Sequence, residues 1–86
     1  MEHPFKEGNA YFFRTVTYHC IGRVTQSVGK FLLLTEAAWI ADSGRFMQTI
    51  RDGILNEIEL VDTLILNLDS TVDAFPWNHP LPREQK

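Results

Sequence analysis

The sequence predicts a mainly β domain, a small barrel of short strands with one short helix inserted after the third strand. Residues 11–42 are dense in β-branched and aromatic side chains, which favour the half-buried surface of a pleated sheet. Gly22 and Gly29 interrupt this stretch, as the bends and turns of a sheet require. After it, the hydrophobic period changes to that of a helix over about residues 44–52.

Length and composition predict a single folded domain. Of the 86 residues, 44% are hydrophobic and 22% are charged, unlike the composition of a disordered chain. We expect one domain over residues 1–86, with an N-terminal arm at 1–9 and a proline-rich C-terminal tail at 76–86. A domain of this size buries only about 60–65% of the surface of its unfolded chain, so oligomerisation would add needed stability.

Charge and cysteine content exclude several classes of protein. The formal net charge of −3 opposes broad, non-specific binding to nucleic-acid backbones. The single cysteine, Cys20, cannot form an intramolecular disulfide, which favours a reducing, cytoplasmic location. The N-terminus lacks the apolar segment of a signal peptide, and no apolar run approaches the roughly 20 residues that span a membrane. We therefore expect a soluble protein without a membrane partner.

Two strands are predicted at the start of the β-rich stretch. The aromatic residues and valine of residues 11–16 predict the first strand, and a tight turn near residues 17–18 follows it. Residues 19–26 predict the second strand, whose alternate side chains face opposite sides. We expect Gly22 to mark a sharp bend or a close approach of another backbone, because glycine has no side chain to obstruct either.

A hairpin turn and a buried third strand are predicted next. Residues 27–30 have the composition of a turn, in which Gly29 supplies the positive φ of a tight reversal. Residues 31–40 are almost continuously apolar, which predicts burial on both faces of the strand. One face would line the barrel interior, and the other would pack on a helix or on a partner chain.

A short helix is predicted over residues 44–52. Asp42 or Ser43 can accept hydrogen bonds from the amides of its first turn, and Gly53 suits the left-handed position after its last turn. An isolated helix of this length is unstable in water, so its apolar side must pack on the barrel. That side consists of Phe46, Met47 and Ile50.

The rest of the chain predicts further strands and the tail. Residues 57–61 alternate between polar and apolar, residues 64–68 form an apolar run, and residues 71–75 predict the last strand. Prolines from residue 76 onward end any strand, so the remaining residues form the tail. Its expected anchors are Trp77 and Leu81.

No catalytic residues, metal site or cofactor are predicted, so we do not expect an enzyme. His19 and Cys20 are neighbours on a strand and project to opposite faces, so His19 cannot activate the thiol. A hydrolase that uses His19 or the carboxylates is the catalytic alternative. The sequence has no Cys-x-x-Cys or His-x-x-x-His pair, no acidic calcium loop and no Gly-x-x-x-x-Gly-Lys phosphate loop.

Residue types that are typical of binding hot spots occur at six positions. Tryptophan and phenylalanine supply rigid stacking area, and arginine supplies a planar cation. The alternative is structural: Trp39 and Phe46 would be core residues, and Trp77 would seal an edge of the barrel. The six candidate ligand-binding residues are Arg14, Arg23, Trp39, Arg45, Phe46 and Trp77.

Two interpretations of the arginines stay open. Arg14 and Arg23 lie on predicted strands among apolar residues, where pairing with an acid across the sheet is favoured. Alternatively, Arg14, Arg23 and Arg45 converge at a junction between subunits and form an anion site for a nucleotide. The candidate acids for pairing are Glu36, Glu57 and Glu59.

Residues 12–39 contain a strand, a tight turn, a second strand with Ile21–Val24, a further turn and a third strand that ends with Leu34–Ala37. This run resembles the first half of an Sm-like (LSm-like), SH3-like barrel. Further segments are Arg14–Thr17, Ala37–Asp42 with Gly44–Phe46, and Val72–Ala74 with Trp77. They carry a closer resemblance, over most of the chain, to uncharacterised small proteins of bacteria and phages that have been described as Sm-like.

This resemblance implies a strongly bent, five-stranded antiparallel barrel and a ring-like homo-oligomer joined through edge strands. It also implies the cytoplasm of a bacterium or of a phage-infected host cell, and it implies no reaction. We therefore expect a non-enzymatic binding or scaffold ring whose partner is a further copy of the chain. The alternative is a ring that binds RNA or a nucleotide, such as a phage-encoded protein that sequesters nucleotides.

Departures from the Sm pattern count against the RNA-binding alternative. RNA-binding Sm proteins carry an acidic-x-x-Met-Asn pattern between the second and third strands, where this chain has Gln26–Lys30. They also carry Arg-Gly or Lys-Gly near the last strands, where this chain has Leu68–Thr71. The predicted helix after the third strand is likewise foreign to the usual Sm plan, whose helix lies at the N-terminus.

Overall fold

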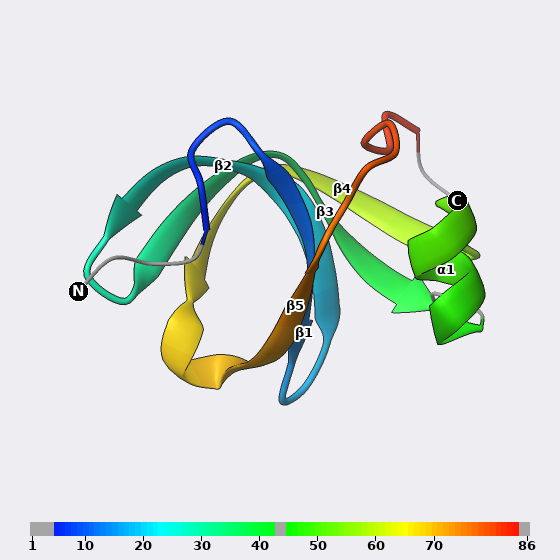
Figure 1. The fold of residues 1–86 in the computed structure, drawn as a ribbon, viewed down its shortest axis with the longest axis horizontal. Coiled ribbons are helices and arrows are strands. Elements are labelled where there is room, and N and C mark those ends of the chain that lie inside the picture. The colour runs from blue at the N-terminus through cyan, green and yellow to red at the C-terminus, as the bar shows by residue number, and fades with distance from the viewer. Residues whose placement is uncertain (1–4, 43–44, 85–86) are drawn as a thin grey trace.

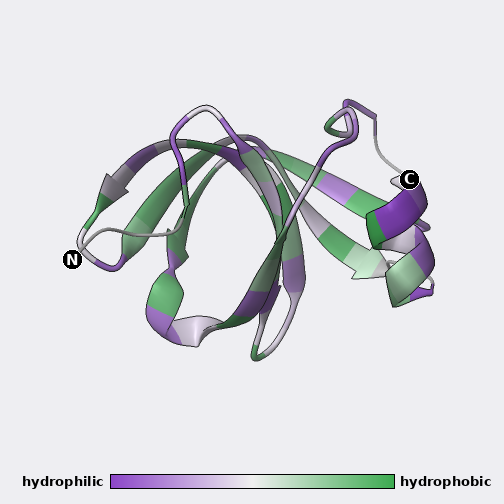
Figure 2. Cartoon of the chain, in the orientation of Figure 1, coloured by the Kyte–Doolittle hydropathy of each residue, from purple (hydrophilic) through white to green (hydrophobic). Residues whose placement is uncertain are grey.

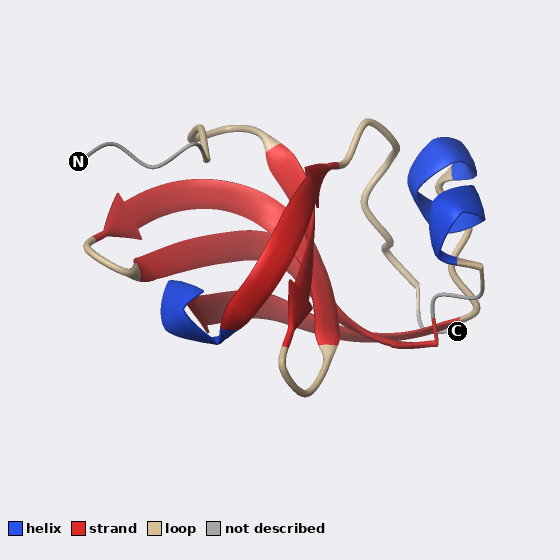
Figure 3. Cartoon of the chain, turned by 60° about the horizontal axis from the view of Figure 1, so that its bottom comes forward, coloured by secondary structure: helices blue, strands red, loops and turns tan. Residues whose placement is uncertain are grey.

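A computed structural model describes residues 5–42 and 45–84 of the chain. Figure 1 shows a sheet that curves over on itself, with the helix α1 at one end of the molecule. Strands account for most of the described residues, as Figure 3 shows. In chain order the elements are β1 (Ala10–Thr15), β2 (His19–Val28), β3 (Phe31–Asp42), α1 (Phe46–Asp52), β4 (Glu57–Asn67), the 3₁₀ helix η1 (Leu68–Ser70) and β5 (Thr71–Pro76).

All five strands belong to one antiparallel sheet with the order β4-β3-β2-β1-β5. The predicted mainly β class with one short helix is therefore confirmed. The sheet is open, because β4 pairs only with β3 and β5 pairs only with β1 among the described residues. The sheet thus ends in two edge strands.

Each face of the sheet has its own hydrophobic core. The inner core lies within the curve of the sheet, and the outer core lies between the sheet, α1 and the C-terminal tail. Figure 2 shows hydrophobic and hydrophilic residues interspersed along the strands, and successive side chains of a strand face opposite sides of the sheet. The inner core consists of Tyr11, Phe13, Cys20, Val24, Leu32, Leu34, Ala37 and Leu66. The outer core consists of Phe12, Ile21, Ala38, Ile40, Leu55, Ile58, Trp77 and Leu81.

Facing bulges let the two longest strands bend. Glu36 in β3 and Asp62 in β4 have positive φ values of 51° and 65°, and the pairing of β3 with β4 shifts register between Leu34 and Ala37. An inserted residue of this kind increases the local twist and turns the strand. Gly22 permits the same bend in β2, because a Cβ atom there would lie 2.9 Å from the Cβ of Leu34. A close approach at Gly22 was predicted, but the groups that approach are the side chains of Leu34 and Ala37 rather than another backbone.

Several predicted strand boundaries were wrong. β2 continues through Val28, so the hairpin turn contains only Gly29 and Lys30, with a φ of 57° at the glycine. β3 continues to Asp42, two residues further than predicted. The separate runs at 57–61 and 64–68 form the single strand β4, since the bulge at Asp62 interrupts the hydrophobic alternation without ending the strand.

Burial of the third strand on both faces is confirmed only in part. Leu32 and Leu34 lie in the inner core, and Ala38 and Ile40 lie in the outer core. Trp39 is 44% exposed, so the prediction that it is a core residue was wrong. Its ring contacts Tyr18, which is itself 37% exposed, rather than a buried core residue.

The helix is placed as predicted, but its ends and its buried side differ in detail. Arg45 is the residue before its first turn and gives no side-chain cap, while Asp42 belongs to β3 and Ser43 and Gly44 lie outside the described residues. Gly53 is left-handed, with a φ of 73°, as predicted. The predicted packing of Met47 was wrong. Met47 is 70% exposed, whereas the helix buries Thr49 and rests Phe46 and Ile50 on the outer core.

Candidate functional site

Arg14 lies at the centre of a polar and aromatic cluster on the outer face of the sheet. Its neighbours across the strands are Asp73 on β5 and His19 on β2. The guanidinium donates two hydrogen bonds to Asp73, from Nε to Oδ1 at 2.6 Å and from Nη2 to Oδ2. This two-bonded geometry fixes the orientation of the guanidinium plane.

Two phenylalanine rings cover the guanidinium. The Arg14 Cζ atom lies 4.6 Å from the ring centroid of Phe46 on α1 and 5.6 Å from that of Phe75 on β5. These two rings meet edge to face, with their centroids 5.0 Å apart. Both distances fall within the range of cation–π attraction. Arg14 therefore links the helix to the edge strand β5.

The ion pair changes the ionisation of both partners. Hydrogen bonding from Arg14 is the main cause that lowers the pKa of Asp73; desolvation opposes it in part, and electrostatic interactions with Arg14 and His19 lower the pKa further. The same hydrogen bond raises the pKa of Arg14. The side chains of Arg14 and Asp73 are 37% and 34% exposed, so solvent reaches the pair and screens it.

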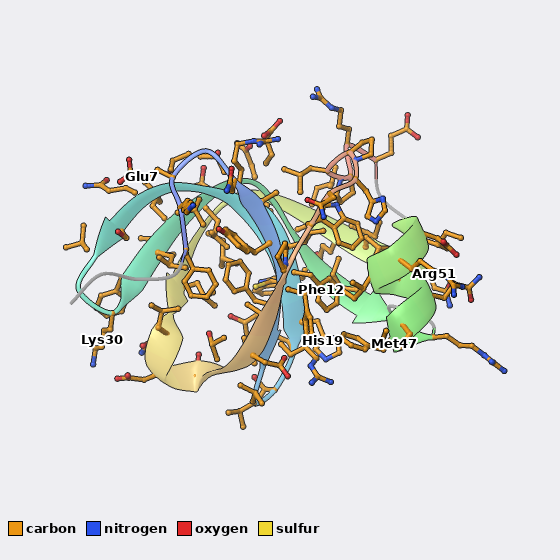
Figure 4. All side chains as sticks on the ribbon, viewed as in Figure 1. Glu7, Phe12, His19, Lys30, Met47 and Arg51 are labelled. Atoms are coloured by element: carbon orange, nitrogen blue, oxygen red, sulfur yellow. The ribbon has the colours of Figure 1, made fainter. Side chains whose placement is uncertain are left out.

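Phe12 extends the cluster toward the C-terminal tail. Its ring centroid lies 6.1 Å from that of Phe46 and 6.0 Å from that of Trp77, with which it stacks at 26°. The indole of Trp77 is buried and donates to the carbonyl of Pro80 at 3.3 Å. Figure 4 labels Phe12 and His19, whose rings lie 5.5 Å apart on the side of the sheet nearest α1.

Three of the six predicted residues therefore meet in one place, and the others do not join them. Arg14, Phe46 and Trp77 belong to the cluster around Phe12. Arg23 makes a separate set of contacts: its Nε donates to Glu36 at 2.7 Å and its Nη1 donates to the carbonyl of Gly8 at 2.9 Å.

Trp39 and Arg45 lie elsewhere on the surface. Trp39 contacts Tyr18, with ring centroids 5.8 Å apart. Arg45 is exposed before the first turn of α1, where its carbonyl accepts from the amide of Thr49. Within one chain, Arg14 and Arg23 thus do not share an anion site with Arg45. The predicted pairing of Arg23 with Glu36 is confirmed, whereas Arg14 pairs with Asp73 rather than with a glutamate.

The sequence analysis missed Asp73, Phe75 and Phe12 as members of the cluster. The pairing of β1 with β5 joins residues 59 positions apart, as in the bond from Arg14 to Asp73, and no local pattern signals it. Alternation within each strand was the available signal. Phe12 and Arg14 are two residues apart, as are Asp73 and Phe75, so each pair faces one side of the sheet.

His19 and Cys20 do face opposite sides of β2. Cys20 is buried in the inner core, where desolvation raises the pKa of its thiol to about 12. His19 lies on the outer face beside Phe12. A thiol with so high a pKa stays protonated at neutral pH and is a poor nucleophile.

The described residues contain neither a metal-binding cluster nor a membrane-spanning helix. Within residues 5–42 and 45–84, no three histidine, cysteine, aspartate or glutamate side chains are close enough to hold a metal ion. In the same part of the chain, no helix has the length and hydrophobicity needed to cross a membrane.

Comparison with known proteins assigns no relative. No family model matches the chain, and no curated protein or solved structure matches it. The fold defines a small protein built on one open, five-stranded antiparallel sheet with a covered outer face.

Proposed function

We propose that this protein is a non-enzymatic, homo-oligomeric Sm-like module that forms a binding or scaffold ring. In this proposal β4 of one copy pairs with β5 of the next copy, and the bent sheet continues around the ring. The observation that carries the proposal is the open sheet, whose two edge strands each have one hydrogen-bonded neighbour among the described residues.

Unpaired strand edges favour such an assembly. The outward N–H and C=O groups of an edge strand attract any other strand, and proteins normally protect them. Pairing β4 with β5 of another copy satisfies both edges at once. Because the two surfaces differ, the contact is head-to-tail, and a ring results where the rotation between copies closes.

The edge strands β4 and β5 are only partly protected against pairing with a strand of another chain. The bulge at Asp62 and the proline at the end of β5 interrupt pairing only locally. Residues 63–67 carry no charge, and Arg14 neutralises the one acid of β5, Asp73. An exposed apolar side chain lies on each edge strand: Ile65 is 68% exposed and Val72 is 66% exposed.

The Sm-like part of the proposal is supported by the shape of the sheet. Five antiparallel strands, a strong bend and a core inside the curve are what the resemblance in the sequence implies. The position of α1 between β3 and β4 departs from the usual plan, and the helix covers the outer core instead of extending the edge. It contacts β5 through the rings of Phe46 and Phe75 but adds no strand to either edge of the sheet.

Sedimentation velocity of edge variants tests the proposal. We expect the wild-type chain to sediment as an oligomer, and Ile65→Lys and Val72→Lys to shift it to the 9.9 kDa monomer, because a charge on the edge strand opposes close pairing. Met47→Lys is the matched control, since Met47 is 70% exposed but lies on α1. A wild-type monomer, or equal effects of all three variants, would contradict the proposal.

A further inference from the structure

A groove of about 510 Å³ lies between the segment before β1 and the segment after β5. Lys6 and Asn9 line it from the first segment, Asn78 and His79 line it from the second, and Arg23 lines it from β2. The volume falls within the range of about 300–1,000 Å³ that is typical of small-molecule sites. No β4 residue lines it, so it is separate from one half of the proposed interface between copies.

The charged residues that line this groove are basic, although the protein is acidic overall. The chain has 11 acidic and 8 basic residues, yet no aspartate or glutamate is among the described residues that line the groove. Two permanent cations, Lys6 and Arg23, line it together with Asn9 and Asn78, while the imidazole of His79 is bonded to the carbonyl of Ile50 on α1. The exposed ammonium of Lys6 has no ion pair with any part of the chain that the structure describes.

Arg23 is held in place by groups next to the groove. Its Nε donates to Glu36 at 2.7 Å and its Nη1 donates to the carbonyl of Gly8 at 2.9 Å. A guanidinium has five N–H donors in a rigid plane, so the two bonds leave others for a ligand. Such a fixed fork, beside the mobile point charge of a lysine, suits the oxygens of a phosphate or carboxylate.

We propose that this groove binds a small oxyanionic ligand, with a phosphate monoester as the class that fits best. Arg23 and Lys6 contact the oxyanion, and the amides of Asn9 and Asn78 donate to it or to the rest of the ligand. The exposed ring of Pro76 lines the groove as well and offers an apolar surface for a planar portion of the ligand. This inference does not depend on the proposed ring.

NMR titration of the full chain at low salt tests the inference. The probes are adenosine monophosphate, inorganic phosphate and adenosine. We expect the first two to shift the amide signals of Gly8, Asn9 and Asn78, and adenosine to leave them unchanged. Tighter binding of the nucleotide than of phosphate would show that the planar portion also binds, and equal binding would show that the oxyanion alone is recognised. Equal shifts with adenosine, or no shift with either anion, would overturn the proposal.

Two lysine variants separate a specific site from general attraction. Lys6→Gln should weaken nucleotide binding about tenfold, which is the effect of losing one hydrogen bond to a charged group. Lys30→Gln removes the same charge from the β2–β3 turn, where Lys30 pairs with Asp69 at 3.1 Å, and it should change the affinity by less than about twofold. Equal weakening by both variants would also overturn the proposal.

Discussion

The contacts of Arg14 show how one residue can join three elements. Its guanidinium binds Asp73 on β5 and stacks beneath Phe46 of α1, while its own backbone lies in β1. Lysine at this position would keep the charge but lose the two-bonded geometry and the flat stacking surface. The residue thus fastens the edge strand β5 and the helix to the central strands.

The lowered pKa of Asp73 predicts a pH dependence of stability. The folded-state pKa lies below the usual value of about 3.9 for the unfolded chain. The ion pair therefore stabilises the fold above that pH, and its contribution disappears as the pH falls through the lowered pKa. We expect Asp73→Asn to lower the melting temperature by a few degrees at pH 7, and the difference from wild type to vanish in acid.

A matched variant controls for the loss of a surface charge. Asp69 is 66% exposed and pairs with Lys30, so Asp69→Asn should change the melting temperature little at any pH. Thermal unfolding of the three proteins between pH 2.5 and pH 7 provides the measurement. A deficit of Asp73→Asn that stays constant across this range would show that the ion pair is not its cause.

At the scale of elements, the short helix α1 is stabilised by the packing of one of its sides on the rest of the molecule. It has only 7 residues and no side-chain N-cap, so packing rather than intrinsic propensity must hold it. Phe46 supplies much of this packing through Phe12, Phe75 and Arg14. Met47, its neighbour in sequence, points to solvent.

Alanine substitutions at these two neighbours should therefore differ. Phe46→Ala should reduce the free energy of unfolding by about 1–3 kcal/mol, because the ring is partly buried against the outer core. Met47→Ala should change it by less than about 0.5 kcal/mol, as is usual for an exposed side chain. Urea denaturation measures both. Equal losses would mean that Phe46 does not hold the helix on the sheet.

Local patterns in the sequence were sufficient to predict most elements but not their pairing. The density of β-branched and aromatic residues predicted β1, β2 and β3, and Gly53 predicted the end of α1. The bulges at Glu36 and Asp62 were not predictable, since neither residue type favours a positive φ as glycine does. They arise where two long strands bend together, which is a property of the folded sheet.

For the candidate site, too, local patterns predicted individual residues but not which residues come together. Arg14, Phe46 and Trp77 were predicted as individual residues because their types suit binding and packing. Their meeting around Phe12 depends on the pairing of β1 with β5 and on the return of the tail across the outer face, which are both long-range contacts. Trp39 failed as a core residue because continuous apolarity of a strand does not show where the covering layer ends.

At the scale of the whole molecule, the open sheet divides the surface into covered and available parts. The inner face encloses its own core, and α1 with the tail covers much of the outer face. The outer edges of β4 and β5 pair with no further strand among the described residues. Assembly through these edges would extend one continuous sheet between copies.

Hydrogen exchange of the edge strands tests this assembly most directly. Mass spectrometry would follow deuterium uptake in peptides that cover residues 57–67 and 71–76, in wild type and in Val72→Lys. We predict slower uptake in the wild type at these two edges, with equal protection of β2 and β3 in both proteins as evidence that the variant is folded. Equal uptake by the edge peptides of the two folded proteins would contradict assembly through β4 and β5.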